Sequence, residues 1–316
     1  MPQLGATAVL AGFVLVSAVL IKRAMASETC TSADSRVSLG DGNSIPAVGF
    51  GMYYTPPGAV AYDIVKEAIK IGYRHIDTAQ AYGNEKGVGE GLRSSGAERS
   101  DIFVTTKVDA GAKTYQDAAA SIEGSLQDLG LDYIDMMIIH SPQPWGDFGS
   151  DNRYFDENRE VWRALEEAYQ AGKLRAIGLS NFQKADVDNI LGSCTERPMI
   201  NQILAHISNT PHDLIAHTQE QGILVEAYSP VAHSELLKNT QVAALAEKYD
   251  VSVPQLSIRY ALQLGLLPLP KTANPAHMKD NAGVDFTISD EDMEALKGLP
   301  ERLTLEVPWV AKLLLG

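Results

Sequence analysis

The chain has 316 residues, 45% of them hydrophobic and 21% charged, which suits a globular protein with room for one barrel-sized domain or two smaller ones. Its net charge of −14 repels phosphate backbones and argues against a nucleic-acid partner. The two cysteines, Cys30 and Cys194, are too few for a disulfide framework or a zinc site, and they fit a reducing compartment.

The first predicted element is an apolar segment. Residues 4–21 are apolar or small throughout, and Lys22 and Arg23 follow them. About 18 helical residues span about 27 Å, close to the hydrocarbon thickness of a bilayer. Three readings stay open: an uncleaved anchor that keeps the main domain in the cytoplasm, a cleaved signal peptide, and an extension without structure or with a misassigned start. We therefore divide the chain into a hydrophobic segment (1–26), a small polar tether (27–36) and one folded domain (37–316).

The folded domain begins with a predicted β-hairpin, because a Gly-Asp-Gly-Asn turn separates two short apolar ends within residues 37–45. Eight strand-like runs follow at the spacing of strand–helix units, and they are almost continuously apolar, as buried parallel strands are. In chain order they are Ala47–Met52, His75–Ala79, Ile102–Val108, Tyr133–His140, Leu174–Ser180, Met199–Leu204, Ile223–Ser229 and Leu266–Pro270.

Amphipathic helices are predicted between these runs, at Ala59–Ile71, Tyr115–Leu129, Asn158–Ala171 and Lys184–Leu191. Eight such units predict a (β/α)8 barrel. The rival fold, an open doubly wound sheet, needs a glycine-rich first turn, and residues 52–55 (Met-Tyr-Tyr-Thr) are not one. The glycine-rich residues 87–91 lack the spacing of a phosphate loop.

Two helices are predicted near the C-terminus. Pro275 begins a short helix through Asn281, and Ser289 caps a last helix whose first turn is acidic. The tail 306–316 is expected to cover one end of the barrel.

Polar groups stand where five of the strand-like runs end, and in a barrel this is the end that carries the active site. The fragments are Asp77–Glu85, Thr106–Lys107, Ile139–Pro142, Gly178–Phe182 and Pro270–Thr272. A phenol is a weak acid, and a neighbouring ammonium group lowers its pKa. We expect Lys107, held by Asp77, to be that cation beside Tyr82, while His140 hydrogen-bonds the substrate oxygen. This set suits hydride transfer to a carbonyl from a nicotinamide cofactor.

The same stretches resemble the aldo-keto reductase family, from about Val37 to near the C-terminus. The matching residues are Ile45–Gly51, Gly72–Ala79, Tyr82–Glu85, Arg175–Phe182, Asn201–Gln202, Ala227–Pro230 and Pro270–Lys271. The resemblance implies a monomeric enzyme without a metal that reduces aldehydes or ketones to alcohols. Its implied catalytic residues are Asp77, Tyr82, Lys107 and His140, with Tyr82 as the general acid.

The resemblance also implies an NADPH site. Its nicotinamide end would be held by Ser180, Asn181 and Gln202 at the carboxamide and by Tyr228 stacked on the ring. The remaining implied cofactor residues follow the pyrophosphate, the 2′-phosphate and the adenine or complete the site, and they are Met52, Asp77, Ser229, Pro230, Val231, Lys271, Thr272, His277 and Asn281.

One cofactor position departs from the family pattern. Many members carry an arginine where this chain has His277. A guanidinium is always charged, whereas a histidine is mostly neutral at pH 7. We therefore predict that NADPH is used with a weakened preference over NADH.

The substrate end is less specific. The loop Gln143–Phe148 resembles that of bacterial-type members, such as 2,5-diketo-D-gluconate reductases, which act on small keto acids, keto sugars and reactive aldehydes. With His140, the side chains of Tyr53, Trp145 and Trp309 are candidate pocket walls, and ordinary packing is their alternative reading. A second functional hypothesis is a cofactor-binding, redox-sensing subunit of a membrane protein with little turnover.

Overall fold

The computed structural model describes residues 35–300 except residue 41. The predictions for residues 1–26, for nearly all of the tether, for Trp309 and for the rest of the tail lie outside these residues. Within the described part of the chain, no helix has the length and apolarity needed to cross a membrane.

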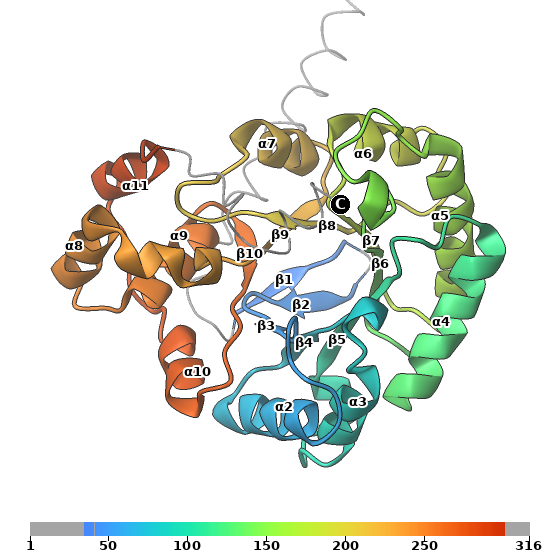
Figure 1. Ribbon diagram of the computed structural model, residues 1–316, viewed down its shortest axis with the longest axis horizontal. Helices are drawn as coiled ribbons and strands as arrows, with labels where there is room; N and C mark the ends of the chain where they lie inside the picture. Colours follow the sequence, from blue (N-terminus) through green and yellow to red (C-terminus); the bar gives the residue numbers. More distant parts are fainter. Residues whose placement is uncertain (1–34, 41, 301–316) are drawn as a thin grey trace, which may run out of the picture.

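Eight parallel strands form a ring in which each strand pairs with its neighbours in chain order (Figure 1). The ring closes where the Gly49 and Gly51 amides donate to the Pro268 and Pro270 carbonyls at 3.1 and 3.0 Å. The (β/α)8 prediction is confirmed. The strands are β3 (Phe50–Gly51), β4 (His75–Asp77), β5 (Phe103–Val108), β6 (Met136–Ile139), β7 (Ile177–Ser180), β8 (Ile200–Leu204), β9 (Leu224–Tyr228) and β10 (Leu266–Leu269).

Helices surround the ring of strands (Figure 1). Three predicted helices have the predicted bounds, and the helix predicted at Asn158–Ala171 starts earlier, at Phe155. Ser289 caps the last helix as predicted, since its hydroxyl accepts from the Asp292 amide. The helices are α2 (Ala59–Ile71), α3 (Glu85–Arg93), α4 (Tyr115–Leu129), α5 (Phe155–Gln170), α6 (Lys184–Leu191), α7 (His212–Glu220), α8 (Thr240–Lys248), α9 (Val253–Gln263), α10 (Pro275–Ala282) and α11 (Asp290–Lys297).

The glycine-rich residues 87–91 lie inside helix α3, which packs between α2 and α4. A Cβ added at Gly89 would lie 1.9 Å from the Leu129 carbonyl oxygen at the end of α4. A Cβ at Gly91 would lie 2.8 Å from the Tyr62 carbonyl oxygen on α2. The glycines therefore allow close helix packing. This packing accounts for the glycine-rich sequence, and no phosphate-binding role is needed.

The predicted hairpin is present as β1 (Arg36–Ser38) and β2 (Ser44–Pro46). Its side chains Leu39 and Ile45 are buried against residues at the amino ends of the barrel strands, including Phe103 and Met136. The hairpin thus closes the amino end of the barrel and leaves the carboxyl end for the polar groups.

Candidate active site

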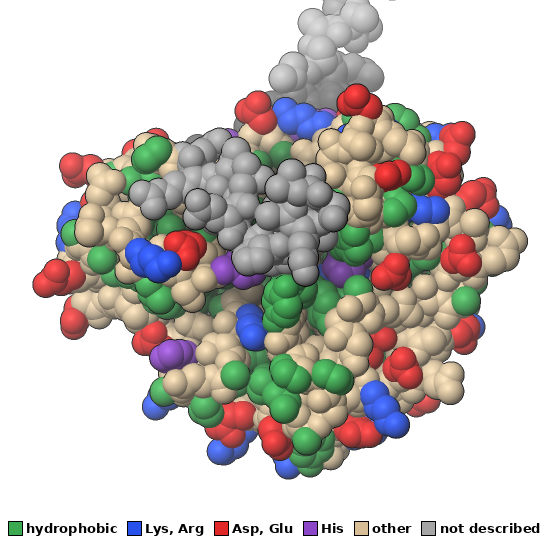
Figure 2. Space-filling model, viewed as in Figure 1, with side chains coloured by type: hydrophobic (Ala, Val, Ile, Leu, Met, Phe, Trp, Pro, Cys, Tyr) green, Lys and Arg blue, Asp and Glu red, His purple; other side chains and the backbone are tan. Residues whose placement is uncertain are grey.

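A cavity of about 900 Å³ lies at the carboxyl end of the barrel, and the loops after most of the strands contribute to its wall. Hydrophobic and histidine side chains gather near the centre of the view in Figure 2, while acidic side chains lie mainly toward its periphery. A local binding site is therefore compatible with the acidic balance of the whole chain.

A buried ion pair lies beneath this cavity. Lys107 on β5 donates to Asp77 Oδ1 at the end of β4 over 2.7 Å and to the Thr78 carbonyl over 2.8 Å. The Lys107 ammonium also lies 5.1 Å from the ring centroid of Tyr82. His140, which follows β6, places its ring 5.7 Å from that of Tyr82. The four predicted catalytic residues therefore lie together.

The protonation of these groups follows from burial. Burial and the nearby charge of Asp77 raise the pKa of Tyr82 well above its ordinary value, which is opposite to the direction expected from Lys107 alone. Burial is the larger cause, and the charge of Lys107 is offset by its pairing with Asp77. Burial and the Lys107 charge hold the pKa of His140 well below its usual range. Near neutral pH, Tyr82 is therefore an intact phenol and His140 a neutral imidazole, and both can donate one hydrogen bond.

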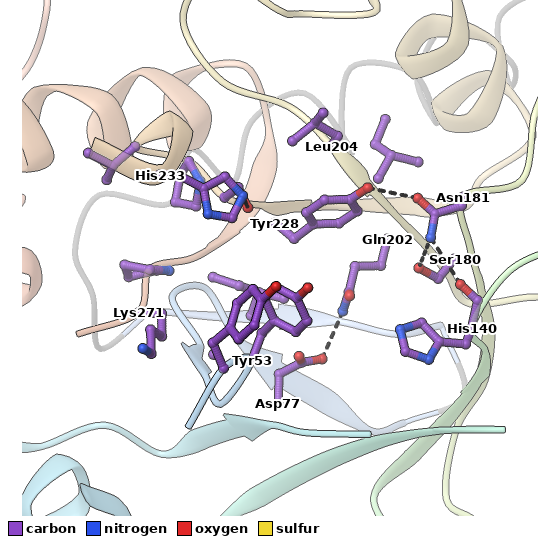
Figure 3. Close-up of a pocket in the computed structure, with 18 of the residues that line it drawn as sticks. Tyr53, Asp77, His140, Ser180, Asn181, Gln202, Leu204, Tyr228, His233 and Lys271 are labelled. Carbon is purple, nitrogen blue, oxygen red and sulfur yellow. Dashed lines mark hydrogen bonds between the residues drawn. The ribbon is translucent and has the colours of Figure 1, made fainter. Parts of the chain in front are cut away.

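Amide and hydroxyl groups line the neighbouring wall (Figure 3). Asn181, which follows β7, donates to the His140 carbonyl over 2.9 Å and to Ser180 Oγ over 3.1 Å. Tyr228 at the end of β9 donates to Asn181 Oδ1 over 2.9 Å. Gln202 on β8 donates to Asp77 Oδ2 over 2.8 Å. These bonds fix an aromatic ring beside a set of amide-binding groups.

The wall also contains a basic region. Lys271 and Thr272 follow β10 and line the cavity, and partial burial lowers the pKa of Lys271. His233, which sequence reasoning missed, lines the same region and lies 3.1 Å from Ser229 Oγ through its Nε2. A lone histidine in an irregular loop gives no sequence signal of this placement.

Most of the other predicted cofactor residues line the cavity, including Ser229, Pro230 and Val231. Three do not appear in its wall. Met52 is fully buried, and His277 and Asn281 lie on α10. Among these three, His277 is exposed.

Aromatic side chains line the part of the cavity beside Tyr82 and His140. Tyr53 lies 5.0 Å from Tyr82, and Trp145 lies 5.0 Å from His140, both between ring centroids. Tyr54 and Phe148 also line the cavity and were not predicted, although each belongs to a segment already singled out in the sequence. A flat apolar group beside the phenol and the imidazole would contact these rings.

The residues present fit a nicotinamide cofactor. The buried polar side chains of Ser180, Asn181 and Gln202 suit an amide, the ring of Tyr228 offers a stacking surface, and Lys271 offers a cation for a phosphate. Fold and site together define a barrel enzyme built for proton donation beside a ligand that carries an aromatic ring and an amide.

Comparison with known proteins supports this class. The sequence profile of the aldo/keto reductase family matches residues 48–301. A glyoxal reductase from Bacillus subtilis is 39% identical over 270 residues, which cover 85% of this chain and 94% of the relative. Aldo-keto reductase family 1 member A1 from Sus scrofa is 34% identical, with 87% and 92% covered. The solved structure of a Bombyx mori aldo-keto reductase in complex with NADP matches with a TM-score of 0.75 at 34% identity, covering 84% of this chain and 93% of that chain.

The chain belongs to the aldo/keto reductase family. It is an oxidoreductase that reduces carbonyl groups with a nicotinamide cofactor, as the sequence predicted. The comparisons give no support to the alternative of a redox-sensing membrane subunit.

Proposed function

We propose that the protein reduces small, reactive aldehydes to alcohols with NADPH, and that Tyr82 donates the proton. The observation that carries the proposal is the position of the Tyr82 phenol in the cavity, between the Lys107–Asp77 pair and the His140 ring. The similarity to a glyoxal reductase supports the choice of a small aldehyde.

Each residue has a distinct role. The bound cofactor supplies a hydride. Tyr82, kept protonated by burial, hydrogen-bonds the carbonyl oxygen and gives it a proton as negative charge develops there. Neutral His140 donates a second hydrogen bond to the same oxygen and orients the substrate. Lys107, fixed by Asp77, stabilises the phenolate that remains.

NADPH is our proposed cofactor because Lys271 and the adjacent Thr272 line the cavity, where a cation and a hydroxyl would bind the 2′-phosphate. Ser180 and Asn181, which lie across the cavity from Lys271 in Figure 3, would hold the carboxamide together with Gln202. His277 would weaken the preference over NADH, since it replaces a permanently charged group.

The test is Tyr82→Phe, measured by steady-state oxidation of NADPH with glyoxal and a panel of other aldehydes. We expect kcat to fall by roughly 10²- to 10⁴-fold, the usual contribution of a general acid, while the Kd for NADPH changes little. Tyr62→Phe on the outer helix α2 is the matched control and keeps full activity. If the kcat of Tyr82→Phe equalled that of wild type, the assignment of Tyr82 as the proton donor would be overturned.

A further inference from the structure

A chain of buried polar groups continues from the active site into the barrel. Glu226 on β9 is fully buried and is the register partner of Gln202 on β8. Gln202 Nε2 donates to Glu226 Oε2 over 2.8 Å and to Asp77 Oδ2 over 2.8 Å. Both amide hydrogens of Gln202 are thus directed at carboxyl groups, and its carbonyl oxygen is the group left for a ligand.

The other oxygen of Glu226 faces a histidine. Glu226 Oε1 lies 3.7 Å from His75 Nδ1 on β4, both side chains are fully buried, and neither atom has a hydrogen-bond partner among the described residues. The second ring nitrogen of His75 lies 2.9 Å from Thr105 Oγ1. A Cβ added at Gly49 would lie 2.5 Å from His75 Nδ1, so the backbone of Gly49 packs closely on the ring.

Two buried acceptors that face each other without a proton would be costly, because each would lose its hydrogen bonds to water and gain none. A proton on Glu226 Oε1 removes this cost once the 3.7 Å separation from His75 Nδ1 closes to hydrogen-bond distance. His75 then carries its own hydrogen on Nε2, where Thr105 Oγ1 can accept it. A hydrogen on His75 Nδ1 instead would leave Glu226 and Asp77 as two carboxylates on the same Gln202 amide, with Lys107 paired to Asp77.

We propose that Glu226 is a neutral carboxylic acid whose Oε1 hydrogen points at His75 Nδ1, and that this pair positions Gln202 for the cofactor carboxamide. The protonation of Glu226 follows from contacts inside the barrel and does not depend on the proposed function. The effect on the cofactor rests on the proposed role of Gln202.

The electrostatics of the interior agree with this arrangement. Burial and the charge of Asp77 raise the pKa of Glu226 to about 8, against the opposing effects of Gln202 and Lys107. Burial and the charges of Lys107 and Arg36 lower the pKa of His75 to about 3. At neutral pH the proton therefore belongs to Glu226 and not to His75.

The first experiment compares Glu226→Gln with Glu226→Leu in the full chain. Glutamine keeps an acceptor for Gln202 and a donor for His75, so we expect its Kd for NADPH, from quenching of protein fluorescence, to stay within threefold of wild type. Leucine removes both groups, and we expect at least a tenfold weaker Kd. Equal losses in the two variants, or no loss in Glu226→Leu, would overturn the positioning role.

The second experiment follows the proton in the free protein, with wild type and Glu226→Gln only. The folded-state pKa of Glu226 is raised from 4.5 to about 8, so the folded protein holds this proton more tightly than the unfolded chain does. Wild type should therefore lose stability relative to Glu226→Gln as pH rises between these values. The measurement is the Tm of each protein, and the wild-type Tm should fall relative to that of Glu226→Gln.

Infrared spectroscopy gives an independent signature. At neutral pH, wild type should show the carbonyl stretch of a protonated carboxylic acid that Glu226→Gln lacks. Parallel Tm curves, or the same infrared spectrum in both proteins, would refute a neutral Glu226. These readouts need neither cofactor nor turnover, so they stand even if Tyr82→Phe overturns the proposed proton donor.

Discussion

At the residue scale, burial and the Lys107–Asp77 pair together explain why the pKa of the Tyr82 phenol is raised and not lowered. A free ammonium would lower the pKa of Tyr82, but this ammonium is matched by a carboxylate 2.7 Å away and both are buried. The phenol therefore stays protonated until the substrate oxygen accepts its hydrogen, which is the state that a general acid needs.

The pair also contributes to stability. Lys107→Met would leave Asp77 as an uncompensated buried charge, and we expect the free energy of unfolding to fall by about 3–5 kcal/mol in urea denaturation. In Asp77→Asn/Lys107→Met, both charges are absent, so most of this loss should be recovered although activity is not. A double variant as unstable as Lys107→Met would show that the loss comes from packing alone.

Cofactor preference is a second prediction at this scale. Wild type should prefer NADPH over NADH in kcat/KM by less than about a thousandfold, roughly 4 kcal/mol. His277→Arg should raise this ratio, because a permanent cation would join the proposed 2′-phosphate site. Lys271→Met is the complementary variant, in which we expect kcat/KM with NADPH to fall more than kcat/KM with NADH. A wild-type ratio above that limit would contradict the prediction.

The scale of single residues also shows what the sequence could predict about the site. Asp77, Lys107 and His140 each follow or end an apolar run, so their meeting at one end of a barrel was predictable. Glu226 was missed because it lies inside such a run, where only three-dimensional pairing shows whether an acid has partners. His233 was missed because its loop has no periodicity.

At the scale of elements, three helices with a regular apolar stripe, α2, α4 and α6, were predicted to the residue. Helix α4 combines such a stripe with a Thr114 cap and Gly130 in the left-handed region at its end. Helix α3 was not predicted, since three glycines lower its intrinsic helix propensity by about 1 kcal/mol each. Its close packing against α2 and α4 outweighs that cost, and this packing is invisible in a local pattern.

Helix α3 gives an element-scale prediction. Gly89→Ala should lower the free energy of unfolding by about 1–3 kcal/mol or more, because its methyl group would overlap the Leu129 carbonyl. The control is Gly124→Ala on α4, where the nearest atom to the new Cβ, Gln80 Nε2, is 3.6 Å away. In this control, alanine is the better helix former and should raise the free energy of unfolding by about 0.5–1 kcal/mol. Equal effects in urea denaturation would refute the close-packing explanation.

At the scale of the whole molecule, the amino end of the barrel contributes to stability and the carboxyl end holds the cavity. The hairpin seals the amino end with apolar side chains, and the cavity occupies the carboxyl end. Ile45→Ala should therefore cost about 2–5 kcal/mol of stability and leave kcat unchanged at a temperature where the variant is folded. Urea denaturation and steady-state assays measure the two effects, and a matching fall in kcat would contradict their separation.

The domain division is a further prediction at this scale. A chain that begins at Ser35 should retain the Tm and the kcat of the full protein and should elute as a monomer, because the proposed folded domain starts at residue 37. Loss of any of these would place residues before Ser35 inside the folded unit.

The hairpin turn has a practical consequence. Gly40 and Gly42 lie in this turn, and a Cβ added at either would meet no atom of the described residues within 4 Å. The turn belongs to the hairpin that closes the amino end of the barrel, and the cavity lies at the carboxyl end. A peptide tag inserted, or a dye attached, between Gly40 and Gly42 would thus tether the enzyme to a surface with the cavity toward the bulk solution.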